Sequence, residues 1–143
     1  MKVRIKTNDW EALFYESTGA CGFDFKCVED LVFAPGEFKL VETWTVVEVP
    51  EWYVLLTAPR SSTFKKHWLI QVNSTWIIDQ DYCGENDTIK FPYLNMSGVE
   101  QKIEAWTRIW QWMFVAIAKP EFEVVQEMWN SKNRWGFWST WVK

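Results

Sequence analysis

Short stretches in which apolar and polar residues alternate recur along most of this 143-residue chain. Alternation with a period of two places one set of side chains on each face of a strand, as half-buried strands require. The same stretches are rich in Val, Ile, Phe and Tyr, which favour strands. They predict strands at residues 2–6, 23–28, 38–49, 52–57, 69–73, 88–94 and 113–118.

Turn-forming residues separate these predicted strands: A-P-G-E at 34–37, V-P-E at 49–51, Y-C-G-E-N-D at 82–87 and N-M-S-G at 95–98. Only S-S-T-F-K-K-H at 61–67 indicates a helix, with a Ser cap and residues for about two turns. Residues 119–143 predict a strand-like piece followed by a polar tail without a core of its own. Many short strands and no long helix predict an all-β sandwich, jelly roll or barrel.

The composition restricts the class of protein. The length predicts one domain, and the formal net charge of -4 argues against a general nucleic-acid binder. No apolar run is long enough for a membrane span, and the start of the chain lacks the apolar core of a signal peptide. Cys21, Cys27 and Cys83 are an odd number, which excludes a complete intrachain disulfide framework. A soluble cytoplasmic protein with reduced thiols is expected.

Two carboxylates lie close together in the middle of the chain. Asp79 and Asp81 flank Gln80, so on a strand both acids would point to one face and the amide to the other. A carboxylate in a pocket can activate a water molecule as a general base. The alternative is a solvated acidic turn before Y-C-G-E.

A second group of polar residues begins the predicted helix. Arg60, Ser61 and Ser62 combine a guanidinium, two hydroxyls and the free N–H groups of a helix start. That combination suits a phosphate group. The alternative is a simple Ser N-cap beside a surface Arg.

Five stretches, taken in order, resemble the five motifs of the trimeric dUTP pyrophosphatase (dUTPase) family, and the resemblance runs from Gly19 to Trp141. Any one stretch alone would be a weak signal, whereas their order and spacing together are a strong one. They are T-G-A-C-G-F-D-F (18–25), A-P-R-S-S (58–62), I-I-D-Q-D-Y-C-G-E (77–85), T-R-I-W-Q (107–111) and R-W-G-F-W-S-T-W (134–141).

The resemblance implies a fold and an activity. The fold would be an all-β jelly-roll-like domain over residues 1–128 with one short helix, followed by a flexible tail at 129–143. The activity would be hydrolysis of dUTP to dUMP and pyrophosphate with Mg²⁺. The protein would be a homotrimer whose active sites are shared among subunits, with no nucleic-acid or membrane partner.

The third motif would supply the catalytic and nucleoside-binding residues. By resemblance Asp79 is the general base, while Asp81 is structural. Tyr82 would form a floor under the deoxyribose that leaves no room for a 2′-hydroxyl, and Asn73 would read uracil. Taken outside the family, a strand Tyr is more often part of the core, and Asn73 would be an ordinary hairpin residue.

The other motifs would hold the triphosphate. Asp24 would order Mg²⁺ indirectly, through water, and Arg108 would be structural. Phe137 would cover the uracil when the tail closes, and either Arg134 or Lys132 would meet the γ-phosphate. The phosphate-binding residues implied by the resemblance are Arg60, Ser61, Ser62, Gln111, Arg134, Ser139 and Thr140.

Twelve tryptophans and only six glycines are an anomaly in a chain with so many turns. Eight tryptophans stand where related sequences usually have glycine: Trp44, Trp52, Trp68, Trp76, Trp106, Trp135, Trp138 and Trp141. Trp110, Trp112 and Trp129 fit the same exchange less clearly, and Trp10 cannot be assigned.

A single cause would explain so uniform an exchange. UGA is read as glycine in some genetic codes and as tryptophan in others. A gene that uses UGA for glycine would therefore give this amino-acid sequence when it is translated with a code that reads UGA as tryptophan. Each Trp in a left-handed turn costs about 1–2 kcal/mol, and an oversized core side chain costs about 1–3 kcal/mol. The tryptophan form is therefore expected to fold poorly.

Other functions stay open at this stage. Genuine surface tryptophans could make the protein a non-catalytic β-sandwich that binds carbohydrate or single-stranded nucleic acid. A dUTP-binding regulator without hydrolysis is a further alternative, against which the retained Asp79 argues. The related dCTP deaminase shares the fold, but D-Q-D-Y and the F-x-S-T tail favour the pyrophosphatase.

Overall fold

The structure is a computed structural model that describes residues 1–8 and 13–128. Within these residues the chain forms short strands and one short helix, as the alternating pattern predicted. In chain order they are β1 (Ile5–Thr7), β2 (Leu13–Phe14), β3 (Phe23–Lys26), β4 (Leu31–Phe33), β5 (Phe38–Glu42), β6 (Thr45–Val47), β7 (Tyr53–Pro59), α1 (Thr63–His67), β8 (Leu69–Gln71), β9 (Trp76–Ile78), β10 (Lys90–Asn95), β11 (Gln101–Ile103) and β12 (Arg108–Ala116).

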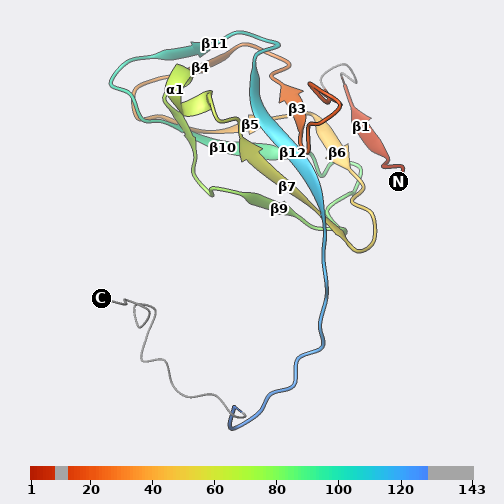
Figure 1. Ribbon diagram of the computed structural model, residues 1–143. Helices are drawn as coiled ribbons and strands as arrows, with labels where there is room; N and C mark the ends of the chain where they lie inside the picture. The colour runs from red at the N-terminus through yellow and green to blue at the C-terminus, as the bar shows by residue number, and fades with distance from the viewer. Residues whose placement is uncertain (9–12, 129–143) are drawn as a thin grey trace.

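The largest sheet has five strands in the order β2-β3-β12-β7-β9. Its longest strand, β12, crosses the middle of the molecule between β3 and β7 and pairs antiparallel with both (Figure 1). Smaller sheets are formed by β5-β10-β8, by β1-β6 and by β4-β11. The edge strand β9 is aligned by its pairing with β7, in which Ile78 lies opposite Leu55. This sheet therefore positions most of the residues that the sequence singled out.

An aromatic core lies between the five-stranded sheet and the β5-β10-β8 sheet. Phe25 of β3 stacks on Trp112 with ring centroids 5.0 Å apart, and Phe91 of β10 stacks on Trp110 at 4.7 Å. All four side chains are fully buried. Burial of such large apolar surfaces is the main force that joins the two sheets. The predicted all-β, jelly-roll-like fold with one short helix is confirmed.

The structure differs from the predicted strands in several places. The strand predicted at 38–49 is two strands, because the chain turns at Trp44, whose φ is 53°. The strand predicted at 113–118 is the end of the longer β12. The strands β2, β4, β9 and β11 were missed, since two or three residues are too few to show an alternating pattern.

The chain beyond β12 carries no further strand in its described part. Residues 117–119 still lie against the start of β7 and the turn after β9, whereas residues 120–128 run away from the sheets (the blue segment in Figure 1) and are exposed. The strand-like piece predicted from residue 119 is therefore wrong as far as residue 128, because this segment pairs with no strand among the described residues. The predicted tail at 129–143 lies outside the described residues. Among the described residues, no helix is long and apolar enough to cross a membrane.

Candidate functional site

Asp79 and Tyr82 lie together at a pocket beside β9. The chain turns directly after Ile78, and the Tyr82 N–H donates to the Asp79 carbonyl at 3.4 Å. Both side chains are exposed and help to line a pocket of about 550 Å³, together with Trp76, Ile77, Ile78 and Asp81. That volume lies in the usual range for small-molecule sites. An exposed carboxylate at the rim of such a pocket can reach both water and a ligand.

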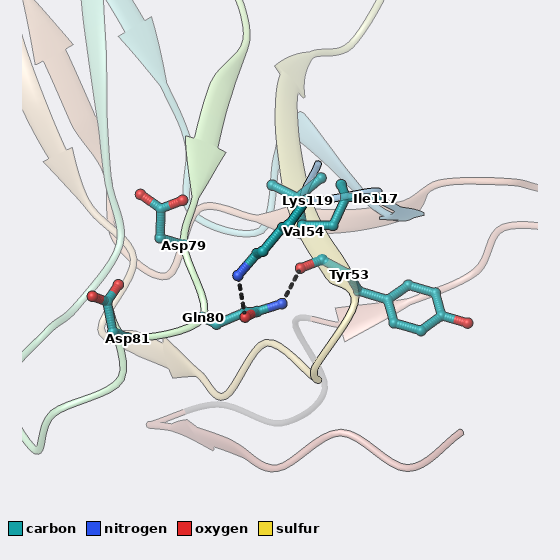
Figure 2. A pocket seen from close by; sticks show the side chains of 7 residues that line it. All are labelled: Tyr53, Val54, Asp79, Gln80, Asp81, Ile117 and Lys119. Carbon is teal, nitrogen blue, oxygen red and sulfur yellow. Dashed lines mark hydrogen bonds between the residues drawn. The ribbon is translucent and has the colours of Figure 1, made fainter. Parts of the chain in front are cut away.

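A smaller pocket of about 350 Å³ borders the same turn and is lined also by Gln80, by the start of β7 and by the chain beyond β12. Figure 2 shows the Asp79 and Asp81 carboxylates on one side and Gln80 pointing away from them, the arrangement predicted for a strand, although these residues lie in a turn. Gln80 Nε2 donates to the Tyr53 carbonyl at 3.1 Å, and its Oε1 accepts from Lys119 Nζ at 2.8 Å. Gln80 thus fastens the acidic turn to the start of β7 and to the chain beyond β12.

The sequence did not predict a role for either partner in this contact. For Gln80 the only signal was its place between two acids, which on a strand would face the opposite way. Lys119 carried none, since nothing in its neighbourhood indicates that the end of β12 passes beside the turn after β9.

Tyr82 forms one wall of the larger pocket. The residue is 41% exposed, and its hydroxyl donates to the Thr88 carbonyl at 3.1 Å. The alternative of a core position is therefore excluded for this Tyr. Asn73 lies in the turn before β9, where the Ser74 N–H donates to the Gln71 carbonyl at 3.0 Å. Asn73 is exposed and is not among the residues that line either pocket.

A second group of predicted residues surrounds the buried carboxylate of Asp24. Asp24 lies on β3 opposite Gln111 of β12 and is 6% exposed. Arg60 Nη1 donates to Asp24 Oδ2 at 2.7 Å, and Arg108 Nη1 lies 3.5 Å from the same oxygen. Arg108 also pairs with Glu16, which agrees with the structural role expected for it. The two guanidiniums thus balance the two carboxylates of Asp24 and Glu16, and the buried Asp24 charge is paired.

A bulge in β12 positions this group. The register against β3 shifts between Arg108 and Trp110, which turns the Ile109 carbonyl toward the end of β7. That carbonyl accepts from the Arg60 N–H at 3.0 Å and from the Thr63 hydroxyl at 2.9 Å. It also accepts from the Tyr93 hydroxyl at 3.1 Å, and burial raises the pKa of Tyr93 well above its ordinary value. Tyr93 therefore remains a hydrogen-bond donor at neutral pH.

The loop from Arg60 to Ser62 is held at the end of β7 by this bulge. Ser61 is exposed and Ser62 is half-buried at the N-cap of α1, where its side chain makes no cap hydrogen bond. The predicted Ser N-cap is confirmed as to the residue, but without the capping hydrogen bond, which leaves the hydroxyl available for another partner. Gln111 is half-buried beside the loop and donates through Nε2 to the Pro59 carbonyl at 3.4 Å.

The two groups lie at opposite ends of β7. Asp79 borders the pocket that Val54 also lines, and Arg60 stands six residues farther along the chain. At about 3.3 Å per residue, this separation amounts to roughly 20 Å. One chain therefore brings Asp79 and Tyr82 together, and separately Asp24, Arg60 and Gln111, but it does not bring the two groups together.

The remaining predicted residues lie in the tail. Lys132, Arg134, Phe137, Ser139 and Thr140 are all outside the described residues. Within the described part of the chain, no three His, Cys, Asp or Glu side chains gather as ligands for a metal ion.

Comparison with known proteins relates this chain to one family. The family described as dUTPase matches residues 8–141, which include all five motifs. The deoxyuridine 5′-triphosphate nucleotidohydrolase of Hydrogenobaculum sp. is 37% identical over the full length of both chains. That of Nautilia profundicola is 34% identical over 98% of this chain and 99% of its own. The dUTPase of Staphylococcus bacteriophage 80alpha, solved with dUPNHPP, covers 99% of each chain with a TM-score of 0.84 at 24% identity, a likeness in fold.

Proposed function

The chain belongs to the dUTPase family, and on that premise we propose that it hydrolyses dUTP to dUMP and pyrophosphate. The position of the Asp79 carboxylate carries the proposal. It is exposed at the rim of a pocket of about 550 Å³, beside the Tyr82 ring, and lies in the third of the five motifs. The family match supports a hydrolase over the binding-module alternative.

Asp79 acts as the general base in this proposal. Its carboxylate takes a proton from a water molecule, and the water oxygen attacks the triphosphate as the phosphoanhydride bond between the α- and β-phosphates breaks. Pyrophosphate leaves, and the carboxyl proton passes to solvent. Tyr82 forms the pocket wall against the deoxyribose and excludes a ribose with its 2′-hydroxyl. Asn73 reads the uracil from the turn before β9.

Arg60, Ser61, Ser62 and Gln111 receive the phosphates. The half-buried Arg60 guanidinium and the Ser61 and Ser62 hydroxyls, which lie together at the end of β7, suit an anionic ligand. Magnesium takes much of its coordination from substrate phosphates and retains several waters, so it needs no protein cage, and Asp24 fits an indirect contact through water. When bound, the ion would neutralise charge that develops on the leaving pyrophosphate.

We infer that the working form is a homotrimer with shared sites. The phosphate-binding group and Asp79 are separated by roughly 20 Å within one chain, which is too far for both to act on one triphosphate. In a closed assembly the Arg60 group of one subunit can meet the Asp79 pocket of its neighbour. The tail, with Arg134, Phe137, Ser139 and Thr140, then closes over the bound nucleotide and excludes water other than the attacking one.

A pyrophosphate-release assay with dUTP, UTP and dCTP tests the proposed function. Selectivity for dUTP is expected, and Asp79→Asn should lower kcat by about 10²–10⁴-fold or more, because the general base is lost. Asp81→Asn is the matched control, since it removes the neighbouring carboxylate and should cause a much smaller loss. Equal turnover of UTP would exclude the role given to Tyr82, and an active Asp79→Asn variant would exclude the mechanism.

The assay needs two forms of the chain. The tryptophan form and the form with glycine at the eight motif and turn positions named above are measured side by side. The glycine form is expected to be the active one, because the tail and turns that close over the nucleotide then carry the smallest side chain. If the folded glycine form left dUTP intact, the proposed function would be wrong.

A further inference from the structure

Tryptophan dominates the left-handed backbone positions of this protein. Among the described residues other than glycine, a positive φ occurs at Trp44, Trp52, Trp68, Trp106 and Ser74. Seven tryptophans lie in the described part of the chain, so four of the seven adopt a conformation that is a genuine outlier for a bulky residue. Glycine is the residue that adopts it without a steric penalty.

The chain contains its own reference for what such a turn requires. Gly36 has a φ of 69° at the third position of a turn in which the Glu37 N–H donates to the Ala34 carbonyl at 3.1 Å. A left-handed third residue is the glycine position of a type II turn. Here glycine stands where the turn geometry demands it.

Two tryptophans occupy the same position in turns of the same kind. Trp52 has a φ of 64° in a turn that the Tyr53 N–H closes on the Pro50 carbonyl at 3.1 Å. Trp106 has a φ of 69°, equal to that of Gly36, in a turn that the Thr107 N–H closes on the Glu104 carbonyl at 3.2 Å.

The other two left-handed tryptophans also take positions that suit glycine. Trp68 follows α1 with φ 54° and ψ 22°, and its N–H donates to the Phe64 carbonyl at 2.8 Å, which is the left-handed motif that ends many helices on glycine. Trp44 has a φ of 53° in the tight turn between β5 and β6.

The side chains at these four positions supply little that would offset the strain. Their exposed fractions are 46% at Trp44, 54% at Trp52, 50% at Trp68 and 50% at Trp106. Trp68 touches Phe64 edge-on, and Trp106 lies 5.7 Å below the Lys26 ammonium, which are weak contacts at a surface.

The three remaining described tryptophans carry a different defect. Trp76, Trp110 and Trp112 lie in strands and have ordinary backbone conformations, but each indole N–H is buried without a hydrogen-bond partner. A buried tryptophan usually finds a partner for this group. Every described tryptophan therefore either has a left-handed backbone or has a buried indole N–H without a hydrogen-bond partner. Neither situation is usual for tryptophan in a folded protein.

We propose that residues 44, 52, 68 and 106 are glycines in the protein as its own cell makes it. Their codons are UGA, which that cell reads as glycine and which a different genetic code reads as tryptophan. The inference goes beyond the proposed function and does not rest on it. It also explains why twelve tryptophans accompany only six glycines. The backbone conformations of Trp76, Trp110 and Trp112 do not require glycine. At these three positions only the codons decide whether the residue is glycine or tryptophan.

Peptide mass spectrometry on the protein isolated from its own cells tests the proposal. Trypsin releases residues 40–60, 67–90 and 103–108 as separate peptides, which together contain all four positions. Each position is expected to have the mass of glycine, with UGA in the gene. Tryptophan at any of the four, or UGG codons there, would overturn the proposal.

Stability measurements on the recombinant tryptophan form test the conformational argument separately. Trp52→Gly and Trp106→Gly should each raise the folding equilibrium constant, by up to about tenfold, because relief of left-handed strain exceeds the added chain entropy of glycine. Glu51→Gly and Ala105→Gly are matched controls at the preceding turn position, and both should lower it. If the tryptophan substitutions destabilised the protein as much as their controls, the argument from left-handed turns would fail.

Discussion

At the scale of single residues, Glu42 shows how one side chain organises a turn that the sequence did not reveal. Its carboxylate accepts from the backbone N–H groups of Thr43 and Trp44, both at 3.0 Å, and from the Thr88 hydroxyl at 3.0 Å. Lys90 Nζ lies 3.2 Å from the same carboxylate. Partial burial opposes ionisation, but these hydrogen bonds together lower the pKa of Glu42 below its ordinary value. Glu42 therefore stabilises the break between β5 and β6 in its charged form.

Glu42→Gln is expected to lower the free energy of unfolding at pH 7 by roughly 1–2 kcal/mol, through loss of charge-assisted hydrogen bonds. The pKa of Glu42 is lower in the folded protein than its unfolded value of about 4.3. The stability that its charged form contributes is therefore complete above the unfolded pKa and is lost as the pH falls through the folded pKa. Urea unfolding from pH 7 to pH 3 should thus show a shallower acid loss for the variant. Glu100→Gln, at an exposed ion pair with Lys102, is the control. An equal acid dependence of stability in the wild type and in Glu42→Gln would contradict the stabilising role given to the charged Glu42.

The three cysteines differ in reactivity because only one is buried. Cys27 lies in the core, and burial raises the pKa of its thiol to about 12, whereas Cys21 and Cys83 are exposed. Since the thiolate is the reactive species, iodoacetamide at pH 8 should add two groups to the folded protein and three in denaturant. Intact-mass measurement counts the adducts. Rapid addition of a third group under native conditions would show that the core around Cys27 opens.

At the scale of elements, the turn after β9 depends on contacts from distant parts of the chain. β9 is a short edge strand, and Gln80 joins the turn that follows it to Tyr53 at the start of β7 and to Lys119 beyond β12. The sequence predicted that Asp79 and Asp81 would lie on one side and Gln80 on the other if they formed a strand; the structure has this arrangement in a turn instead (Figure 2). The sequence did not predict β9 itself, because three residues give no periodicity.

Gln80→Ala should lower kcat for dUTP while leaving KM nearly unchanged. The substitution removes the hydrogen bonds that position the turn carrying Asp79, the proposed general base, but it removes no substrate contact. A loss of about 1 kcal/mol in the free energy of unfolding is also expected from the broken hydrogen bonds. Lys119→Met should give a smaller effect in the same direction, and Lys102→Met, at a surface pair on β11, should give none. A rise in KM at constant kcat for Gln80→Ala would indicate a substrate contact instead of a positioning role.

At the scale of the whole molecule, the five motifs divide into two groups that one chain holds apart. The first, second and fourth motifs meet around Asp24, where β3, β12 and the end of β7 adjoin. The third motif lies at the opposite end of β7. The fifth lies beyond the described residues. The order of these motifs is visible in the sequence, but their separation of roughly 20 Å depends on strand register.

Mixed assemblies test whether sites are shared. Asp79→Asn and Arg60→Ala should each be inactive alone, and co-folding the two should restore activity, because some sites combine an intact Asp79 from one subunit with an intact Arg60 from another. With equal random mixing, roughly a quarter of the sites are complete. A pyrophosphate-release assay with dUTP measures the recovery. Mixtures as inactive as the separate variants would place both residues of each site on one chain.

The sequence by itself determined the fold class, the family resemblance and the set of candidate site residues, since alternation and motif spacing are local properties of the chain. It also raised the tryptophan anomaly. Only the tertiary structure decided that Asp79 and Arg60 lie at opposite ends of one strand, that Gln80 and Lys119 meet, and that four tryptophans are left-handed. These depend on strand pairing and turn geometry, which arise from contacts between residues far apart in the chain.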